Sequence, residues 1–334
     1  MSLVTKLLGI IILLLSFGGG WAWLDYQNSL STPVISEQTI LFEIERGNNF
    51  NQITEKLVQN KVKINPLWFK LLAHQKDLTH KLKAGEYRLN PGLTSSELLT
   101  KLVSGKAIQY SITFPEGWTF KQIRKRIQQN PKIKQTLDKL NDIAVLAKLE
   151  SKEKHPEGLF FPDTYHFDKN ATDLSLLQRA YTKMQQTLHK EWQSKEPDIP
   201  LKTPYEALIL ASIVEKETGK VSERQQIAGV FTRRLRKGML LQTDPTVIYG
   251  MGESYKGNIR YKDLRKPTPY NTYVIKGLPP TPIAMPGKEA IHAALHPAKG
   301  NSIYFVSRGD GSHVFSATLK DHNNAVNTFQ RKNK

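Results

Sequence analysis

The sequence predicts an α+β protein that begins with a membrane-spanning helix. Three observations lead to this fold class. Residues 7–24 form an uncharged apolar run, a strand–glycine–helix pattern recurs three times before residue 128, and a long helix with a clear start follows Thr203. The chain has 334 residues, enough for two or three domains. We expect a cytoplasmic tip and anchor over 1–25, a linker over 26–38, an α+β region over 39–113, an intermediate α+β region over 114–200 and a mixed α+β domain over 201–332.

The first segment has the length of a membrane span. Leu7 to Leu24 comprises 18 residues, close to the roughly 20 that cross a bilayer as a helix. Lys6 and the amino terminus are the nearby positive charges, so we expect a cytoplasmic N-terminus with the bulk of the chain outside. A cleaved signal peptide is the alternative. Because Trp21 and Trp23 crowd the Gly18–Gly20 stretch and no Ala-x-Ala site is present, a retained single-pass anchor is favoured.

A recurring pattern predicts three βα units. Each unit has a strand-like stretch, a glycine suited to a turn, and two apolar residues six and ten positions after the glycine, which is helical spacing. The strands are expected at 39–44, 87–89 and 110–114. The glycines and helix residues are Gly47 with Ile53 and Leu57, Gly92 with Leu98 and Leu102, and Gly117 with Ile123 and Ile127. A short helix is expected over 66–73, and the polar stretch 186–200 predicts a domain boundary.

The formal net charge of the chain indicates which kinds of partner it would bind. The formal net charge of +18 favours a polyanion such as anionic lipid headgroups, an acidic polymer or nucleic acid, although a merely solvated basic surface has the same composition. Residues 121–139 are rich in lysine and arginine and predict an amphipathic helix with a basic outer face, with contact to anionic headgroups or wall polymer as the functional interpretation. The chain has no cysteine, which excludes disulfides, thiolate zinc sites and a cysteine nucleophile.

A helix over 204–218 carries two candidate carboxylates. Thr203 can cap its start, and Gly219 ends it. Glu215 and Glu217 lie about 200° apart around the helix axis, so they face nearly opposite ways. Glu217 falls within the bulkiest apolar arc and Glu215 within a less enclosed one. Because apolar surroundings favour the protonated form of a carboxyl, Glu217 is the better candidate for a general acid.

Three later loops carry amide, hydroxyl and aromatic groups. Residues 241–246, 270–273 and 277–280 suit a sugar, which needs hydrogen bonds to its hydroxyls and a stacking face, with ordinary turn chemistry as the alternative. Residues 302–306 and 313–315 predict a final strand pair. We find no His-Glu-x-x-His, Gly-x-Ser-x-Gly or phosphate-loop spacing, so no metal and no cofactor are expected.

Eight motifs follow one another in order along the chain: Lys83–Tyr87, Glu157–Tyr165, Ala211–Thr218, Leu241–Gly250, Tyr270–Tyr273, Gly277–Pro280, His296–Ala298 and His313–Phe315. Together they resemble the endolytic murein transglycosylase (YceG-like) family, from the anchor to about Phe329. The Gly47–Val62 unit also resembles a LysM module, with a generic α+β module as the alternative. One departure is Thr281, which stands where the family commonly has glycine.

The resemblance implies an inner-membrane protein with a LysM-like region and a catalytic domain in the periplasm. It implies cleavage of the β-1,4 bond between N-acetylmuramic acid and N-acetylglucosamine in nascent peptidoglycan strands, which terminates their elongation. The family's catalytic glutamate is the second Glu of Glu-Lys-Glu, here Glu217. The expected partners are peptidoglycan glycan strands, the penicillin-binding synthases that make them and an anionic membrane surface, and nucleic acid is not expected.

In the chemistry implied by the resemblance, the muramoyl 6-hydroxyl attacks its own C1 and leaves a 1,6-anhydro end. One residue then suffices, because Glu217 first protonates the leaving oxygen and then removes the proton from the 6-hydroxyl. The candidates for holding the substrate are Gln242, Thr243, Asn271, Asp163 and Tyr165.

Two other functions are compatible with these residues. A water-using muramidase would employ Asp163 or Asp244 as a second carboxylate. A non-enzymatic scaffold would use only the basic surface and the LysM-like region to bind the cell wall. For Glu217 itself, the alternative is a structural ion pair with Arg224 or Arg233.

Overall fold

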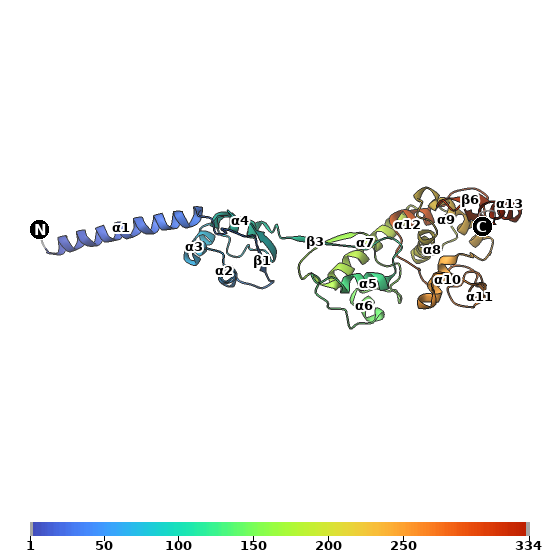
Figure 1. Cartoon of the computed structure of the whole chain (residues 1–334), viewed down its shortest axis with the longest axis horizontal. Helices are drawn as coiled ribbons and strands as arrows, with labels where there is room; N and C mark the ends of the chain where they lie inside the picture. Colours follow the sequence, from blue (N-terminus) through green and yellow to red (C-terminus); the bar gives the residue numbers. More distant parts are fainter. Residues whose placement is uncertain (1–2, 332–334) are drawn as a thin grey trace. The chain divides into compact units, whose positions relative to one another are not determined.

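The computed structural model describes residues 3–331 and combines helices with short strands (Figure 1), which confirms the α+β class. The chain divides into two compact units. The first unit runs to Tyr110 and includes His166–Lys169. The second unit comprises Ser111–Tyr165 and the chain from Asn170 onward.

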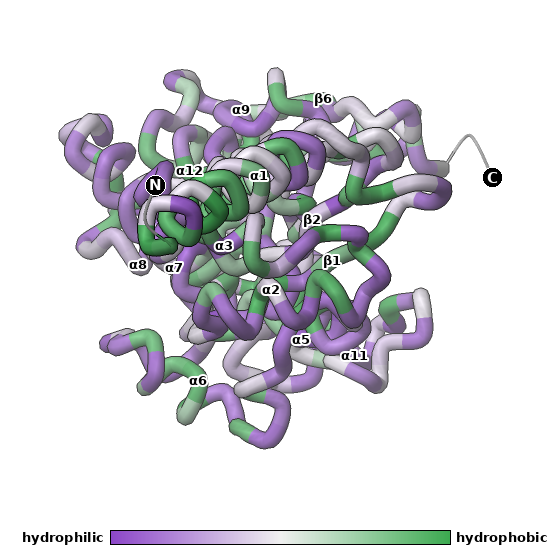
Figure 2. Tube along the Cα trace, turned by 90° about the vertical axis from the view of Figure 1, so that its left-hand side faces the viewer, coloured by the Kyte–Doolittle hydropathy of each residue, from purple (hydrophilic) through white to green (hydrophobic). Residues whose placement is uncertain are grey.

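The N-terminal helix α1, Leu3–Ser31, is long and apolar enough to cross a membrane. Its 29 residues extend roughly 43 Å at 1.5 Å per residue. Its large apolar side chains from Leu7 to Leu24 are exposed, and Figure 2 shows the hydrophobic colour along this helix. Because this surface is not buried within the protein, it favours another apolar environment.

Helix α1 continues past the predicted anchor. The sequence predicts a linker from residue 26, but Tyr26 is buried and its hydroxyl donates to Gln75 Oε1 at 2.6 Å. Trp68 Nε1 donates to Asp25 Oδ2 at 2.7 Å. Both contacts fix the end of α1 on helix α3, so the helix replaces the first six residues of the predicted linker.

The first unit is built around a two-stranded antiparallel sheet. Strand β1, Ile40–Ile44, pairs with β2, Gly85–Leu89, in a register that sets Ile40 opposite Leu89. Helices α2, Phe50–Gln59, and α3, Pro66–Gln75, lie between the strands in the chain, and α4, Ser95–Ser104, follows β2. Their apolar faces and the inner side of the sheet form one hydrophobic core.

The three predicted βα units are confirmed. Their glycines adopt positive φ angles of 91°, 86° and 74° at Gly47, Gly92 and Gly117, which side chains other than glycine resist. Each following helix, α2, α4 or α5, starts with a capping box in which the N-cap and N3 side chains bond to each other's backbone. The six predicted helix residues, which are Ile53, Leu57, Leu98, Leu102, Ile123 and Ile127, are at most 2% exposed.

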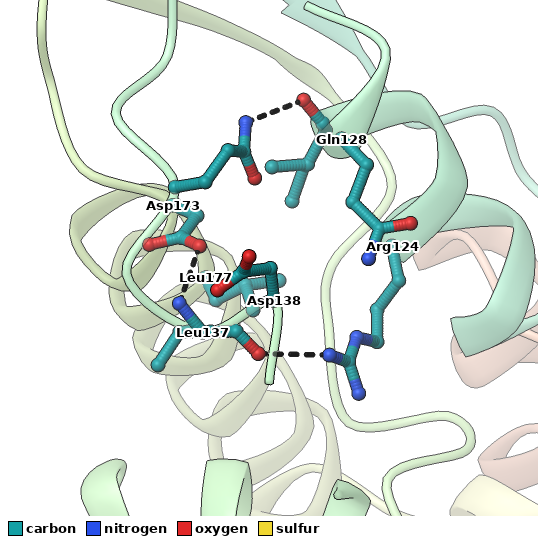
Figure 3. A pocket seen from close by; sticks show the side chains of 8 residues that line it. Arg124, Gln128, Leu137, Asp138, Asp173 and Leu177 are labelled. Atoms are coloured by element: carbon teal, nitrogen blue, oxygen red, sulfur yellow. Dashed lines mark hydrogen bonds between the residues drawn. The ribbon is translucent and has the colours of Figure 1, made fainter. Parts of the chain in front are cut away.

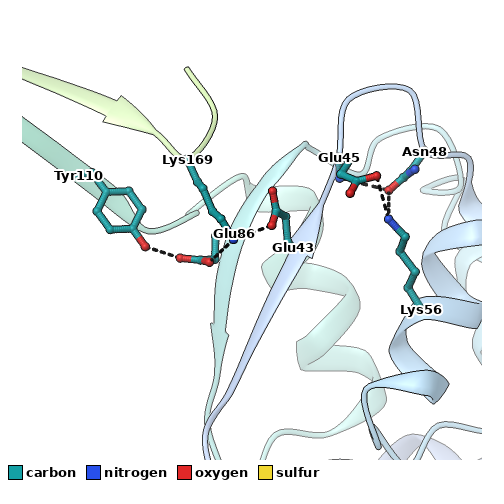
Figure 4. Close-up of polar contacts among 7 residues, drawn as sticks. All are labelled: Glu43, Glu45, Asn48, Lys56, Glu86, Tyr110 and Lys169. Carbon is teal, nitrogen blue, oxygen red and sulfur yellow. Dashed lines mark hydrogen bonds and ion pairs between the residues drawn. The ribbon is translucent and has the colours of Figure 1, made fainter. Parts of the chain in front are cut away.

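An ionic cluster closes one edge of the first unit (Figure 4). Lys169 Nζ lies 2.6 Å from Glu43 Oε2 and 2.8 Å from Glu86 Oε1. The Tyr110 hydroxyl donates to the other oxygen of Glu86, whose side chain is only 4% exposed. Because a buried carboxylate is costly without partners, these bonds stabilise Glu86 in β2.

Strands β3, Gln109–Thr113, and β4, Thr164–Asp168, pair with each other, and their residues are divided between the two units. The second unit continues with helices α5, Phe120–Gln128, α6, Asp142–Lys148, and α7, Asp173–Gln193. The predicted basic helix over 121–139 is wrong in length, because α5 ends before Asn130-Pro131 and an irregular segment follows. Helix α7 continues to Gln193, so the first eight residues of the stretch 186–200, where the sequence predicts a domain boundary, are helical.

Helix α8, Pro204–Glu217, is the centre of the second unit. Its residues 207–214 are at most 4% exposed, because α7, α9, α10 and α12 all pack against it. The surrounding elements are α9, Val221–Arg236, α10, Asp244–Met251, the 3-10 turn Gly252–Ser254, α11, Tyr261–Arg265, and α12, Lys288–Leu295. The predicted final strand pair is confirmed as antiparallel β5, Tyr304–Ser307, and β6, His313–Ser316, followed by α13, Leu319–Val326, and the π-helical turn Asn327–Arg331.

Candidate active site

Glu217 is the last residue of α8. Thr203 caps the start of this helix, as predicted, by accepting a hydrogen bond from Glu206 N at 3.2 Å. The helix ends because Thr218 adopts an extended conformation, with φ −146° and ψ 134°, one residue before the predicted terminator Gly219. The apolar helix α8 therefore ends in a carboxyl group. The negative pole of the helix dipole lies at this end and disfavours the ionised form of that group.

The pKa of Glu217 is raised from 4.5 to about 7, chiefly because its surroundings remove water from the carboxyl group. A hydrogen bond from the Thr243 hydroxyl to Glu217 Oε1 lowers the pKa, the negative charge of Asp244 raises it, and the positive charge of Arg234 lowers it. The side chain is partly buried rather than sealed. A carboxyl with this pKa can give up and accept a proton near neutral pH.

Hydroxyl groups hold Thr243 in place beside Glu217. Thr243 N donates to Thr272 Oγ1 at 3.1 Å, and the Thr246 hydroxyl donates to Thr243 O at 2.8 Å. The Thr246 and Thr272 hydroxyls lie 2.9 Å apart. All three threonines are buried, at 0–2% exposed. The motifs around Thr243 and Thr272 therefore act as one rigid support that aims a hydroxyl at Glu217.

Asp244 lies next to Thr243 at the start of α10. The Tyr273 hydroxyl donates to Asp244 Oδ1 at 2.6 Å, and the aspartate is exposed. Its charge acts on Glu217 through space and is one of the causes of the raised pKa. Asp244 is therefore a second carboxylate close to the candidate acid, whereas Tyr273 fixes its orientation.

A buried cation completes these surroundings. Arg234 on α9 is 7% exposed, and its guanidinium donates to the carbonyls of Ile303 at 2.7 Å and Leu241 at 2.9 Å. The same group lies 3.4 Å from Gln242 Oε1. Its charge favours the ionised form of Glu217, which is the form left after a proton has been donated.

Glu215, two residues earlier, is committed to an ion pair. Its carboxylate lies 2.9 Å from Arg224 NH2 and accepts a hydrogen bond from Gly287 N at 2.9 Å. Both side chains of the pair are 5% exposed, because Arg224 of α9 and the residue before α12 cover Glu215. Arg224 thus pairs with Glu215 and not with Glu217, and Arg233 donates to backbone carbonyls of Ser302 and Ala298.

The predicted substrate residues divide into two sets. Gln242 is exposed beside Thr243 and has the unusual φ of 51°, a left-handed conformation that is costly for a side chain of this kind. Asn271 is 1% exposed, and its amide donates to three backbone carbonyls while its oxygen accepts from Tyr273 N. Because those bonds use the amide group, Asn271 is placed to shape the loop and not to hold a sugar.

Asp163 and Tyr165 lie among other elements. Asp163 pairs with Lys183 of α7 and accepts a hydrogen bond from Thr164 N at 2.7 Å. The Tyr165 hydroxyl donates to Phe161 O at 2.7 Å, and its ring packs against Phe114. Glu217 instead accepts a hydrogen bond from Thr243, just before α10, and interacts electrostatically with Arg234 of α9. The structure does not bring Asp163 or Tyr165 into the set of residues around Glu217.

A cleft of about 600 Å³ opens next to the elements that hold Glu217. Lys216 of α8 and Pro245 of α10 line it, although Glu217 itself does not. Glu157 and Tyr249 lie on another wall, where Glu157 accepts hydrogen bonds from Phe120 N at 2.8 Å and the Tyr249 hydroxyl at 3.1 Å. Burial raises the pKa of Glu157 to about 7. The volume and the mixed polar and aromatic lining suit a sugar-sized ligand.

Two other hollows are less suitable. The crevice in Figure 3 holds about 10 Å³, roughly the space of one water molecule. There Asp173 accepts hydrogen bonds from Leu137 N at 2.8 Å, and Arg124 donates to Leu137 O at 2.9 Å, which organises the irregular segment after α5. The Gly277–Pro280 loop lines a separate groove with Thr203, about 20 Å along α8 from Glu217 at 1.5 Å per residue.

Sequence reasoning missed Arg234, Thr272 and Tyr273 as individual residues. Arg234 continues the apolar stripe of α9 through Ile227 and Phe231, and an arginine on a buried stripe is a usable signal. Thr272 and Tyr273 lie in a recognised motif, but their partners are a loop about thirty residues earlier and cannot be read from local spacing. Thr281, the departure from the family pattern, is accommodated because its hydroxyl lies 2.8 Å from that of Tyr270.

A partly buried carboxyl of raised pKa that accepts a hydrogen bond from a hydroxyl near a cleft is the arrangement expected of an acid–base enzyme. The family model described as the YceG-like family matches residues 42–328. A Bacillus subtilis (strain 168) protein named endolytic murein transglycosylase is 35% identical over 323 residues, which covers 91% of this chain and 89% of that protein. The chain therefore belongs to the YceG-like family.

Two further comparisons agree. A Streptococcus pneumoniae (strain D39) protein, also named endolytic murein transglycosylase, is 28% identical over 95% of this chain, which spans 63% of the length of that relative. The crystal structure of a YceG-like protein from Listeria monocytogenes matches with a TM-score of 0.54 and 33% identity, covering 86% of this chain and 99% of that one.

Proposed function

We propose that this protein is an endolytic lytic transglycosylase that cleaves the β-1,4 bond between N-acetylmuramic acid and N-acetylglucosamine in peptidoglycan. The observation that carries the proposal is Glu217, whose pKa is raised to about 7 at the end of α8 and whose carboxyl accepts a hydrogen bond from Thr243. The family membership and the names of the relatives support the substrate class.

In the first step the protonated Glu217 donates its proton to the glycosidic oxygen. The bond from this oxygen to C1 of the muramoyl sugar breaks, and the N-acetylglucosamine end departs as an alcohol. Thr243 occupies Oε1 of the carboxyl group, which leaves Oε2 to carry the transferred proton. Arg234 stabilises the carboxylate that results.

In the second step the carboxylate of Glu217 takes the proton of the muramoyl 6-hydroxyl while O6 bonds to C1. The product is a 1,6-anhydro end, Glu217 regains its proton, and no water is consumed. Since the nucleophile belongs to the substrate, the step gains the advantage of an intramolecular reaction. Gln242 is the exposed residue that we assign to holding the sugar, because it lies next to Thr243.

One alternative reaction, the hydrolysis of the glycosidic bond by water, is also compatible with the structure. Asp244 lies close enough for its charge to raise the pKa of Glu217, so a muramidase could use it to activate water. The Tyr273 hydroxyl donates to Asp244 Oδ1, so one oxygen of this carboxylate is already occupied and the side chain is held in place. Asp163 is a weaker candidate for this role, because it pairs with Lys183 of α7.

We further propose that α1 is a retained single-pass anchor with its N-terminus in the cytoplasm and both units in the periplasm. Its length and hydropathy support a membrane span, and Lys6 at its start supports the orientation. The order β1–α2–α3–β2 supports a LysM-like module that binds the wall. An anchored enzyme would meet nascent strands beside the penicillin-binding synthases, and its cuts would terminate their elongation.

Digestion of purified peptidoglycan tests the proposed activity. The wild-type chain should shorten the strands by internal cuts and release fragments whose muramoyl ends are one water lighter than reducing ends. Glu217→Gln should still bind peptidoglycan but release no fragments. Fragment release by Glu217→Gln at the wild-type rate would refute the role of Glu217, and binding without cleavage by both proteins would favour a scaffold.

A further inference from the structure

A side-chain cluster outside the candidate active site has the composition of a metal site. Glu191 lies near the end of α7, and His292 and His296 lie four residues apart at the end of α12. The two helices pack side by side in the second unit (Figure 1). We propose that these three residues bind a divalent transition-metal ion, with Zn²⁺ as the ion that the ligand set fits best.

The distances already approach those of a coordination shell. His292 Nδ1 lies 2.8 Å from Glu191 Oε2, and the ligand atoms of all three residues lie within 4.8 Å of one another. Zinc bonds of about 2.0–2.1 Å in a tetrahedron place neighbouring ligand atoms roughly 3.3 Å apart. The two imidazole rings lie face to face, with centroids 4.2 Å apart, so small side-chain rotations would bring them around one ion.

The carboxylate of Glu191 is the negatively charged group of the cluster and the group that would attract a cation. It is 6% exposed, and across residues 3–331 His292 Nδ1 is its one hydrogen-bonding side chain. An ionised carboxylate can accept several hydrogen bonds, so Glu191 has room for a further partner besides His292. A bound ion would be that partner and would pair the negative charge of Glu191 with a positive one.

The ligand types select the kind of ion. Two imidazoles and one carboxylate suit zinc and its neighbours in the transition series, whereas magnesium and calcium prefer shells of oxygen ligands. Three protein ligands leave a fourth position. The Ser194 hydroxyl lies 3.4 Å from His296 Nε2 and donates to Glu191 O, so it lies beside the cluster, and a water molecule would fill the fourth position.

The cluster also explains a motif that the candidate active site does not use. In His296-Pro297-Ala298, Ala298 has a packing role, because its N–H donates to Gln225 O at 2.8 Å and its carbonyl accepts from Arg233 at 2.8 Å. Neither bond involves the His296 ring. Spacing searches miss the site because Glu191 lies on a different helix, about a hundred residues before the histidines.

A metal at this place would clamp α7 to α12. Helix α12 packs on both α8 and α9, the helices that carry Glu217 and Arg234. The ion would therefore act as a structural clip at a distance from the proton-transfer groups. Its effect should appear first in stability, since an ion that binds only the folded chain raises the free energy of unfolding.

The test uses the tag-free, full-length protein in detergent, stripped with chelator and titrated calorimetrically with ZnCl₂ and, separately, MgCl₂. We expect about one Zn²⁺ per chain, no Mg²⁺ binding, and a higher melting temperature with Zn²⁺. Glu191→Gln keeps the shape and the hydrogen bond to His292 but loses the charge, and it should weaken Zn²⁺ binding by at least about 10-fold. His296→Ala should weaken it further.

The matched control is His189→Ala. His189 is an exposed histidine on α7, close to Glu191 in the helix but bonded to Gln193 and outside the cluster. It should bind Zn²⁺ as the wild type does. The proposal is overturned if the wild type takes up no Zn²⁺, or if Glu191→Gln and His296→Ala bind it as tightly as the control. Because no readout depends on glycan cleavage, the result is independent of the proposed activity.

Discussion

At the scale of single residues, two glutamates on one helix differ through their neighbours. Glu215 faces Arg224 and the backbone before α12, so although burial raises its pKa, the hydrogen bond from Gly287 N and the charge of Arg224 oppose that rise. Glu217 faces the Thr243 hydroxyl and a nearby Asp244, so burial prevails and its pKa rises to about 7. The helix directs the two side chains to opposite sides, and the residues around each side chain determine how its carboxyl group behaves.

The first prediction compares Glu217→Gln with Glu215→Gln. Glu217→Gln should lower the rate of strand cleavage by about 10²–10⁴-fold, because Glu217 is the proposed proton donor. Glu215→Gln should instead lower stability by about 1–3 kcal/mol, because Arg224 loses its buried partner and keeps only Glu116 at 3.3 Å. Cleavage assays below the melting temperature of both variants measure the difference, and an equal loss of activity per folded molecule would contradict the assignment.

The second prediction concerns stability and pH. The pKa of Glu217 is about 7 in the folded protein and 4.5 for an ordinary glutamate, so the folded chain binds this proton more tightly than the unfolded chain does. Stability from this group is complete below pH 4.5 and is lost as the pH rises through 7. Glu217→Gln removes this loss.

Urea titrations at two pH values measure that effect. At pH 8 the variant should be more stable than the wild type by about 1–2 kcal/mol, less than the full shift implies because the side chain partly reaches solvent. At pH 4 the two proteins should unfold alike. A variant that is less stable at pH 8 would show that the carboxylate of Glu217 is a stabilising partner in the folded state.

Sequence reasoning reached Glu217 because helical periodicity alone places it among apolar residues. It could not reach the pairing of Glu215, because Arg224 belongs to the next helix and only packing brings the two together. Asn271 also shows that tertiary contacts cannot be predicted from the local sequence. An amide in a polar loop predicts sugar binding, yet tertiary contacts with three backbone carbonyls use it for the loop itself.

At the scale of elements, the three strand–glycine–helix units were predictable because all their determinants are local. Glycine adopts the positive φ, the polar residue two positions later caps the helix, and the apolar spacing sets the buried face. One helix end was missed although the sequence carries a helix-breaking proline. Residues 121–139 kept a basic, helix-like composition, but the chain leaves the helix before Pro131.

The third prediction tests the turn at Gly92. Its φ is 86°, and an added Cβ would meet nothing within 4 Å, so a substitution there changes backbone strain without a clash. Gly92→Ala should destabilise the first unit by about 1–2 kcal/mol, the cost of a left-handed alanine. Gly92→Asn is the matched control, because asparagine tolerates this conformation better. Equal unfolding midpoints for both variants would contradict the role given to φ.

At the scale of the whole molecule, the sequence predicted a single apolar helix followed by α+β packing, and both are present. It did not predict that the chain would return to the first unit. Residues 166–169 do so because Lys169 pairs with Glu43 and Glu86, contacts between residues about eighty to a hundred and thirty positions apart. Pairs of residues this far apart in the chain produce no periodic pattern from which they could be predicted.

The fourth prediction is that α1 stays attached to the mature protein. Its exposed apolar side chains run through Trp21 and Trp23 without a small-residue cleavage site, and Tyr26 fixes the end of the helix to α3. Sequencing the N-terminus of the membrane-extracted protein should give the first residues of the chain. A start near residue 21, with the protein recovered in the soluble fraction, would refute a retained anchor.

The central claim is that one carboxyl group, Glu217, serves as both acid and base and that the substrate supplies its own nucleophile. Digestion of purified peptidoglycan in ¹⁸O-water, followed by mass spectrometry of the sugar ends, tests it most directly. The account predicts 1,6-anhydromuramoyl ends that carry no ¹⁸O. Reducing ends labelled with ¹⁸O, with no anhydro product, would contradict it and would assign the activation of water to Asp244.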